Sequence, residues 1–209
     1  MENTKRAGII VIVLIFIAIL LILLIPILSN KYTYTSPNGE KFTFAKARVG
    51  ELTMHILTTY TTYKGDLTNY KQVIPLINGP KTLEEIEVQK NINNKILNKK
   101  FVYITLDPNF KGDAVIASID IAKVLGTADY SVFKIPTQGA FTYSNNVNST
   151  ITPIITCNNA NNDIGVILLN LSKENKIYSS RECVILEATT YDNLIKVADR
   201  LVYNLLGVM

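Results

Sequence analysis

The sequence has few of the residues on which common catalytic sites depend. His55 is the only histidine, and the ten glycines are scattered at turns and form no phosphate-binding loop. A Ser–His or Cys–His pair, or a zinc site that uses imidazole, would therefore have to use His55. Because this lone histidine lies inside an expected strand, we interpret it as a structural or surface residue.

The excess of positive charge is also small. The formal net charge is +4 over 209 residues. Without Glu2, Lys5 and Arg6, which together carry +1, the remainder carries +3. So mild and dispersed a charge predicts no nucleic-acid partner.

Charge is absent altogether from Ala7–Leu28, where 18 of 22 residues are Ile, Leu, Val or Phe. At about 1.5 Å per residue this run reaches roughly 33 Å as a helix, enough to cross a hydrocarbon core of about 30 Å. The run therefore predicts one transmembrane helix that binds the lipid bilayer. It has no polar residue that could line a transport path, so we interpret it as a plain anchor.

Two alternatives to this signal-anchor remain open. A cleaved signal peptide has an apolar region of about 7–15 residues and a small-x-small cleavage site, and Ile27–Asn30 offers no such site. A pilin-like subunit is suggested by Lys5–Gly8 before the apolar run. Pilin helices usually continue as an amphipathic rod, whereas Pro26 and Tyr32–Tyr34 end this run promptly.

The charges that flank the run predict its orientation. Lys5 and Arg6 precede it directly, and short positive flanks stay in the cytoplasm. We therefore expect a cytoplasmic leader at 1–6, a transmembrane anchor at 7–28 and an extracytoplasmic domain at 29–209. This arrangement describes a single-pass protein of the cell envelope.

Two cysteines and two sequons agree with an outside location. Outside the membrane, an even cysteine count favours a disulfide between Cys157 and Cys183 over two buried thiols. Closing the 26-residue separation would stabilise the fold by about 3.5 kcal/mol in the chain-entropy model. Asn148 and Asn170 begin N-x-[ST] sequons and are candidate glycosylation sites.

The pattern beyond the anchor predicts an α/β domain, more closely an α+β mixed sheet with flanking helices. A hairpin is expected at 31–46, and Pro75 indicates an edge strand at 73–77. A capping box at Thr82–Glu85 indicates a helix from 82 toward 97. The other expected strands are 52–63, 101–106, 130–135, 151–157, 165–171, 176–178 and 182–188, and the other helices are 113–125 and 191–206. The unit 101–135 should be a right-handed parallel crossover.

Three aspartates are the strongest candidates for chemistry. Asp107 follows an expected parallel strand, where ligands gather in open α/β sheets, and Asp113 and Asp120 lie nearby in sequence. Together they suggest a divalent-metal site in a membrane-tethered hydrolase-like enzyme. The simpler interpretation, which we favour, makes Asp107 a turn residue, Asp113 a helix cap and Asp120 a solvent-facing helix residue. No other metal or cofactor site is indicated.

Several short segments of the chain together resemble segments found in one group of proteins. They are the aromatic hairpin after a single span, Leu106–Pro108 with an Ala/Ile-rich helix after it, the strands that carry Cys157 and Cys183, and the terminal helix with Ala198–Leu201 and Leu206–Met209. In these the chain resembles membrane-anchored proteins of small-genome archaea. The resemblance implies an archaeal envelope location and assigns no activity. The plain anchor, the absence of catalytic motifs and the Tyr/Thr-rich strands lead us to expect a binding or structural module that contacts envelope proteins or polymers.

Overall fold

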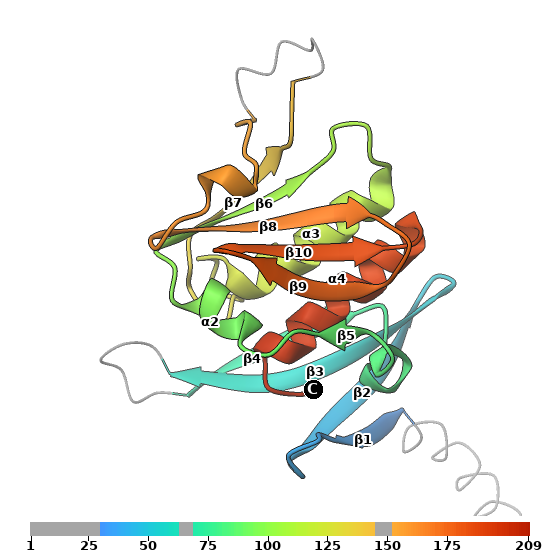
Figure 1. Cartoon of the computed structure of the whole chain (residues 1–209). Coiled ribbons are helices and arrows are strands. Elements are labelled where there is room, and N and C mark those ends of the chain that lie inside the picture. The colour runs from blue at the N-terminus through green and yellow to red at the C-terminus, as the bar shows by residue number, and fades with distance from the viewer. Residues whose placement is uncertain (1–29, 63–68, 145–151) are drawn as a thin grey trace, which may run out of the picture.

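The computed structural model describes residues 30–62, 69–144 and 152–209. These residues form a mixed α+β fold with two sheets and a small number of helices (Figure 1). The expected mixture of strands and helices is thus confirmed, although the strands divide between two sheets. The predicted anchor at 7–28 lies outside the described residues. Within the described ranges, no helix combines the length and the apolar character needed to cross a membrane.

The smaller sheet is antiparallel and follows the chain order β1-β2-β3-β4. It confirms the hairpin expected at 31–46, whose turn is closed by hydrogen bonds between Ser36 and Glu40. Pro75 lies on the last strand in this order, as expected of an edge strand. The four strands are β1 (Lys31–Thr35), β2 (Lys41–Val49), β3 (Leu52–Thr62) and β4 (Asn69–Leu76).

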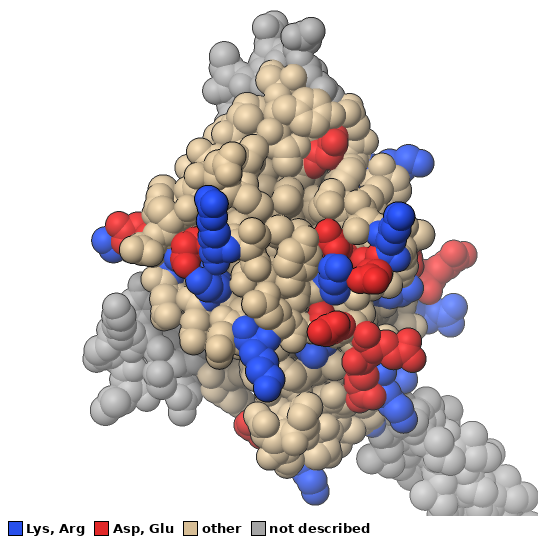
Figure 2. Space-filling model, viewed as in Figure 1, with Lys and Arg blue, Asp and Glu red and all other residues tan. Residues whose placement is uncertain are grey.

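The larger sheet has the order β5-β9-β10-β8-β6-β7, and only β9 and β10 are antiparallel neighbours. Its strands are β5 (Glu87–Val88), β6 (Phe101–Leu106), β7 (Thr137–Phe141), β8 (Ile164–Leu171), β9 (Lys176–Ser180) and β10 (Cys183–Ala188). The view that faces this sheet shows charged side chains of both signs mainly around its margins (Figure 2).

The parallel crossover is confirmed, but its second strand lies later than the sequence predicts. Helix α3 (Gly112–Leu125) connects β6 to β7, and the segment 130–135 forms no strand. The N–H groups of Val132 and Phe133 donate to the carbonyl oxygen of Val124. Because the N–H groups of this segment donate hydrogen bonds to carbonyl oxygens at the end of α3, they are not available to pair with another strand.

The helix expected over 82–97 is wrong. The Thr82 hydroxyl donates a hydrogen bond to the Gly79 carbonyl oxygen (2.8 Å). In a capping box it would instead accept a hydrogen bond from the backbone N–H of Glu85. The chain instead forms a 3-10 turn, η1 (Pro80–Leu83), then β5, then the short helix α2 (Ile92–Leu97). The pairing of β5 with β9 at the sheet edge overrides the local helical pattern.

The strand expected over 151–157 is also wrong in its described part. Ile154 makes one isolated bridge to Phe141, and a 3-10 turn, η2 (Cys157–Asn159), follows. The side chain of Thr156 accepts from the Asn158 N–H and caps this turn. The local capping bonds therefore end the extended segment early.

Helix α4 (Tyr191–Leu205) packs between the two sheets, which explains why nine of its 15 residues are buried. It lies behind β9 and β10 in Figure 1, and its Tyr203 ring contacts Phe44 of the smaller sheet edge-on (5.7 Å between centroids). Thr190 caps its start, one residue from the predicted Thr189. Gly207 has φ +73°, and Val208 bonds back to the Tyr203 carbonyl, as predicted for the helix end.

Cys157 and Cys183 lie at disulfide-bonding distance, with 5.2 Å between their Cα atoms. This value falls inside the range of about 4.4–6.8 Å that a bridge requires. The pair connects the start of η2 to the start of β10. The expected proximity of the two cysteines is thus confirmed.

Candidate functional site

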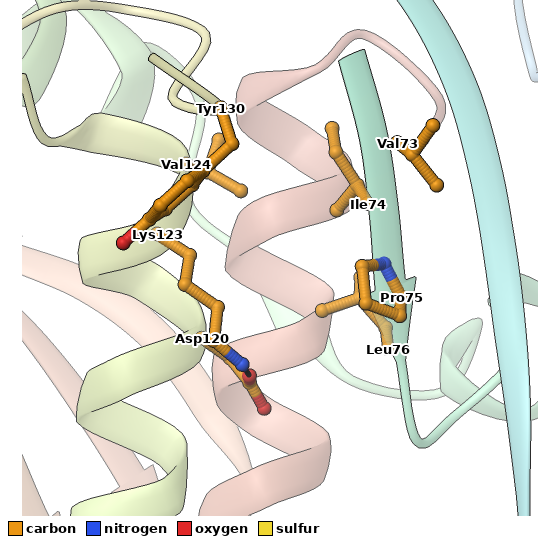
Figure 3. Close-up of a pocket in the computed structure, with 8 residues that line it drawn as sticks. All are labelled: Val73, Ile74, Pro75, Leu76, Asp120, Lys123, Val124 and Tyr130. Carbon is orange, nitrogen blue, oxygen red and sulfur yellow. Dashed lines mark hydrogen bonds and ion pairs between the residues drawn. The ribbon is translucent and has the colours of Figure 1, made fainter. Parts of the chain in front are cut away.

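A mostly apolar groove lies between helix α3 and strand β4, with a volume of about 260 Å³. We call it the α3–β4 groove. Most of its surface is apolar, and one end carries a carboxylate and an ammonium group (Figure 3). Its lining residues are Val73, Ile74, Pro75, Leu76, Asp120, Lys123, Val124 and Tyr130.

The β4 side of the groove is the free edge of a sheet. Among the described strands, β4 pairs only with β3, and Pro75 lies opposite Ile56. Proline has no N–H, so it suits a position whose N–H would point away from the neighbouring strand. Because backbone groups alternate along a strand, those of Val73 point to the same free edge. The edge therefore offers the N–H and C=O of Val73 and the C=O of Pro75.

Asp120 and Lys123 form the polar end of the groove. The Lys123 ammonium donates to Oδ1 of Asp120 at 3.0 Å, and Figure 3 shows both side chains projecting from α3. Burial raises the pKa of Asp120, while Lys123 lowers it. The predicted solvent-facing position is wrong, since Asp120 is only 5% exposed. It lies on the buried stripe of α3, three residues after Ala117 and four before Val124.

A second carboxylate, Asp199 on α4, is fully buried and was not a candidate from sequence. Its Oδ2 accepts from the backbone N–H and the side-chain amide of Asn78, both at 2.9 Å. Its Oδ1 has no hydrogen-bond partner within the described part of the chain. Burial raises the pKa of Asp199 to about 7; the Asn78 bonds oppose this, and the charge of Asp120 adds to it.

One sequence signal could have identified Asp199. It follows Ile195 by four residues and precedes Val202 by three, so helical spacing places it on the apolar stripe of the last helix. A carboxylate at such a position must be paired or must stay neutral. Its partner, Asn78, could not be found this way because it lies 121 residues away in the chain.

His55 joins the smaller sheet to η1. A hydrogen bond of 2.7 Å connects its Nδ1 to the Tyr32 hydroxyl, and the two rings meet edge-on. Burial lowers the pKa of His55, and the charge of Lys46 lowers it further, which favours the neutral ring. A Cβ atom at Gly79 would lie 2.8 Å from this ring, so the position requires glycine. The geometry agrees with the structural role expected for His55.

The other two predicted aspartates do not join Asp120. Oδ1 of Asp107 accepts from the Asn109 N–H (2.8 Å) and from the Tyr143 hydroxyl (3.0 Å), which makes Asp107 a turn residue. Asp113 lies in the first turn of α3, where Lys111 occupies the N-cap position and no side-chain cap forms. Across residues 30–62, 69–144 and 152–209, no group of three His, Cys, Asp or Glu side chains could hold a metal ion.

Of the two candidate glycosylation sites, Asn170 lies among the described residues. Asn170 lies near the end of β8 and is exposed, so its side-chain amide can be reached from solvent. Asn148 lies outside the described residues.

No protein-family model, curated protein or solved structure matches this chain. The resemblance to anchored envelope proteins therefore stays an expectation from the sequence. The groove and the surfaces around it are therefore the features that bear on function.

Proposed function

We propose that this protein is a membrane-anchored, extracytoplasmic binding module of the cell envelope that holds an extended peptide segment along the free edge of β4. The observation that carries the proposal is the position of the α3–β4 groove directly beside an unpaired strand edge. A peptide strand added there would gain backbone hydrogen bonds from β4 and side-chain contacts from the groove.

The dimensions of the groove favour part of a longer chain over a complete small molecule. Its volume of about 260 Å³ lies below the range of about 300–1,000 Å³ typical of small-molecule sites. Four consecutive β4 residues, Val73–Leu76, line it, and at about 3.4 Å per residue they span roughly 10–14 Å. That length accommodates a few residues of an added strand, with alternate side chains directed into the groove.

The side chains of the groove define the chemistry of the expected peptide. Ile74, Leu76 and Val124 offer apolar contacts, which favour branched or aromatic side chains. The Asp120–Lys123 pair offers a carboxylate and an ammonium group at one end. A polar peptide residue at that end would replace part of the solvation that the pair loses on binding.

The envelope location has separate support. The uncharged run at 7–28 has the length and composition of an anchor, and the two cysteines lie at bonding distance, as a disulfide outside the cytoplasm requires. The hydrolase hypothesis required Asp107 to share a pocket with a second acidic group. Asp107 instead accepts turn hydrogen bonds, so this geometry gives that hypothesis no support. The region on which the pilin-like alternative depends lies outside the described residues.

The decisive experiment alters only the backbone of the free edge. Full-length protein in lipid nanodiscs is used to select from a phage-displayed 12-residue peptide library, and the enriched peptides are synthesised for fluorescence anisotropy. Val73→Pro removes the outward N–H without affecting the ladder to β3, and Val73→Thr is the matched control that keeps it. We expect the Pro variant to lose binding at least about tenfold, the equivalent of one or two hydrogen bonds, and the Thr variant to retain it. Peptides that bind both variants equally, or a failure to enrich any peptide, would contradict the proposal.

A further inference from the structure

The smaller sheet has two very different faces. Its inner face packs on α4 through Phe44, Leu57 and Ile74, which are paired across three strands. Since side chains alternate along a strand, the intervening residues form the opposite face, which we call the outer sheet face. Its central residues are Ala45, Ala47 and Val49 of β2, Leu52, Met54, Ile56 and Tyr60 of β3, and Val73 and Pro75 of β4.

The outer sheet face leaves large apolar side chains in contact with solvent. Val49 is 64% exposed, Leu52 54%, Tyr60 63% and Val73 49%. Val49 and Leu52 are directly paired, and Thr58 pairs with Val73 two residues from Tyr60, so the four belong to one surface. A contiguous apolar surface of this kind marks an interaction site more often than single exposed residues do.

The charges on this face have one sign. Lys31, Lys41 and Lys71 follow the same alternation and lie around its apolar centre. No strand residue on the outer sheet face is acidic; the nearest acidic residues in the chain, Glu40 and Glu51, lie in the turns. An apolar centre with a cationic rim is complementary to a bilayer surface that carries anionic headgroups.

The chain places this sheet next to its expected anchor. Lys31, the first residue of β1, follows Leu28 by three residues, which span about 10 Å when extended. The smaller sheet is therefore the part of the domain closest to the bilayer along the chain, while β7 and η2 lie at the opposite end of the molecule (Figure 1). The short connection limits how far the outer sheet face can move from the headgroups.

From these observations we infer that the outer sheet face rests on the bilayer surface, with its lysines among anionic headgroups and Val49, Leu52 and Tyr60 at the boundary with the acyl chains. Tyrosine is enriched at this depth of the membrane. The inference rests on the membrane anchorage in the proposed function and not on peptide binding. The contact would fix the orientation of the domain, with the free edge of β4 beside the membrane.

The chain offers a clean reporter because it contains no tryptophan. Leu52→Trp places one on the outer sheet face, and Ile154→Trp places the matched control at another exposed apolar position, opposite Phe141 at the end of β7. Each full-length variant is reconstituted in phosphatidylcholine–phosphatidylglycerol vesicles with and without lipids brominated near the headgroup. We expect bromine to remove most of the Leu52→Trp emission and to leave Ile154→Trp unchanged.

Flotation of the same vesicles separates this inference from the anchorage beneath it. If the protein floats but Leu52→Trp is not quenched, the anchor holds and the contact of the outer sheet face is refuted. If the protein does not float, both the membrane anchorage and the contact of the outer sheet face are refuted. The tryptophan of Leu52→Trp could instead be shielded from water to a degree that depends on the protein-to-lipid ratio, without quenching by bromine. That result would assign the outer sheet face to a second copy of the chain and would also refute the inference. Replacing Lys31, Lys41 and Lys71 by Gln should reduce the quenching in anionic vesicles only.

Discussion

The two sheets of this protein differ in how much of each is committed to the fold. In the larger sheet, neighbouring strands are mostly parallel, and the cysteine pair ties η2 to its central strand β10. The smaller sheet is antiparallel between neighbours in the chain, and only its inner face is buried. The larger sheet thus behaves as a scaffold, while the smaller sheet keeps one edge and one face available for contacts. Four experiments can test or refine this division.

The largest effect is expected where the two sheets meet. Tyr203→Ala removes a fully buried ring from α4, together with its contact to Phe44 and its hydrogen bond to the Asn78 carbonyl. We expect a loss of about 3–5 kcal/mol in the free energy of unfolding, measured by urea denaturation. Tyr203→Phe keeps the ring and should cost about 1 kcal/mol. Equal losses in the two variants would show that the ring does not join the sheets.

The second effect depends on pH. The pKa of Asp199 in the folded state, about 7, lies above the ordinary aspartate value of 3.8. Between pH 3.8 and about pH 7, the Asp199 carboxyl group therefore keeps its proton in the folded state and loses it in the unfolded state. The contribution of Asp199 to the free energy of unfolding is fully present below about pH 4 and is lost as the pH rises through 7. The change is on the order of 4 kcal/mol.

The matched variant for this pH effect is Asp199→Asn, which keeps the size of the side chain and an oxygen for the Asn78 donors. Unfolding measured from pH 4 to pH 8 should show a smaller decline for the variant than for the parent. The variant should also be the more stable of the two at pH 8. Parallel curves of unfolding free energy against pH for the two proteins would show that Asp199 does not cause the decline.

The third effect concerns the cysteine pair of the larger sheet. Replacing Cys157 or Cys183 by Ser should lower the stability by about 2–4 kcal/mol, and the difference should vanish when the parent is reduced. Non-reducing gels of alkylated membranes test the bond directly. Two freely alkylated thiols in unreduced membranes would contradict both the bridge and the outside location.

The smallest effect is expected for Leu52→Ala on the outer face of β3, and Leu57→Ala on its inner face is the reference for comparison. Leu57 is buried on the inner face, and Leu57→Ala should cost about 2–5 kcal/mol. Leu52 lies on the outer sheet face, and Leu52→Ala should change the stability by no more than about 0.5 kcal/mol in detergent. Chemical denaturation of both variants measures the contrast. Similar losses would show that the outer sheet face is also part of the core.

The sequence predicted elements whose signals are local. The hairpin turn, the strand 101–106 and the helix end at Gly207 depend on residues close in the chain, and all three were confirmed. The segment 130–135 depends on the carbonyls at the end of α3. The helix expected at 82–97 yields to a strand partner about 90 residues later. A distant strand partner thus displaces the expected helix, whereas the expected strand at 130–135 is displaced by the end of the helix that precedes it.

The candidate site was less accessible to prediction than the fold. The sequence singles out Asp120, but the element that covers it, helix α4, packs against α3 only in the complete fold. Asp199 and Asn78 are brought together only by the complete fold. The proximity of Cys157 and Cys183, by contrast, could be predicted because the sequence offers only one possible pair.

The place of β10 in the larger sheet has a consequence for folding kinetics. The last strand of the chain lies between β8 and β9 and not at an edge, so this sheet cannot close until nearly the whole chain is available. The smaller sheet has all its strands by Leu76, but its inner face must wait for α4. Non-local closure of this kind is slow. During that interval, apolar surface on both faces of the smaller sheet is open to aggregation, so protection of its inner face depends on the docking of α4.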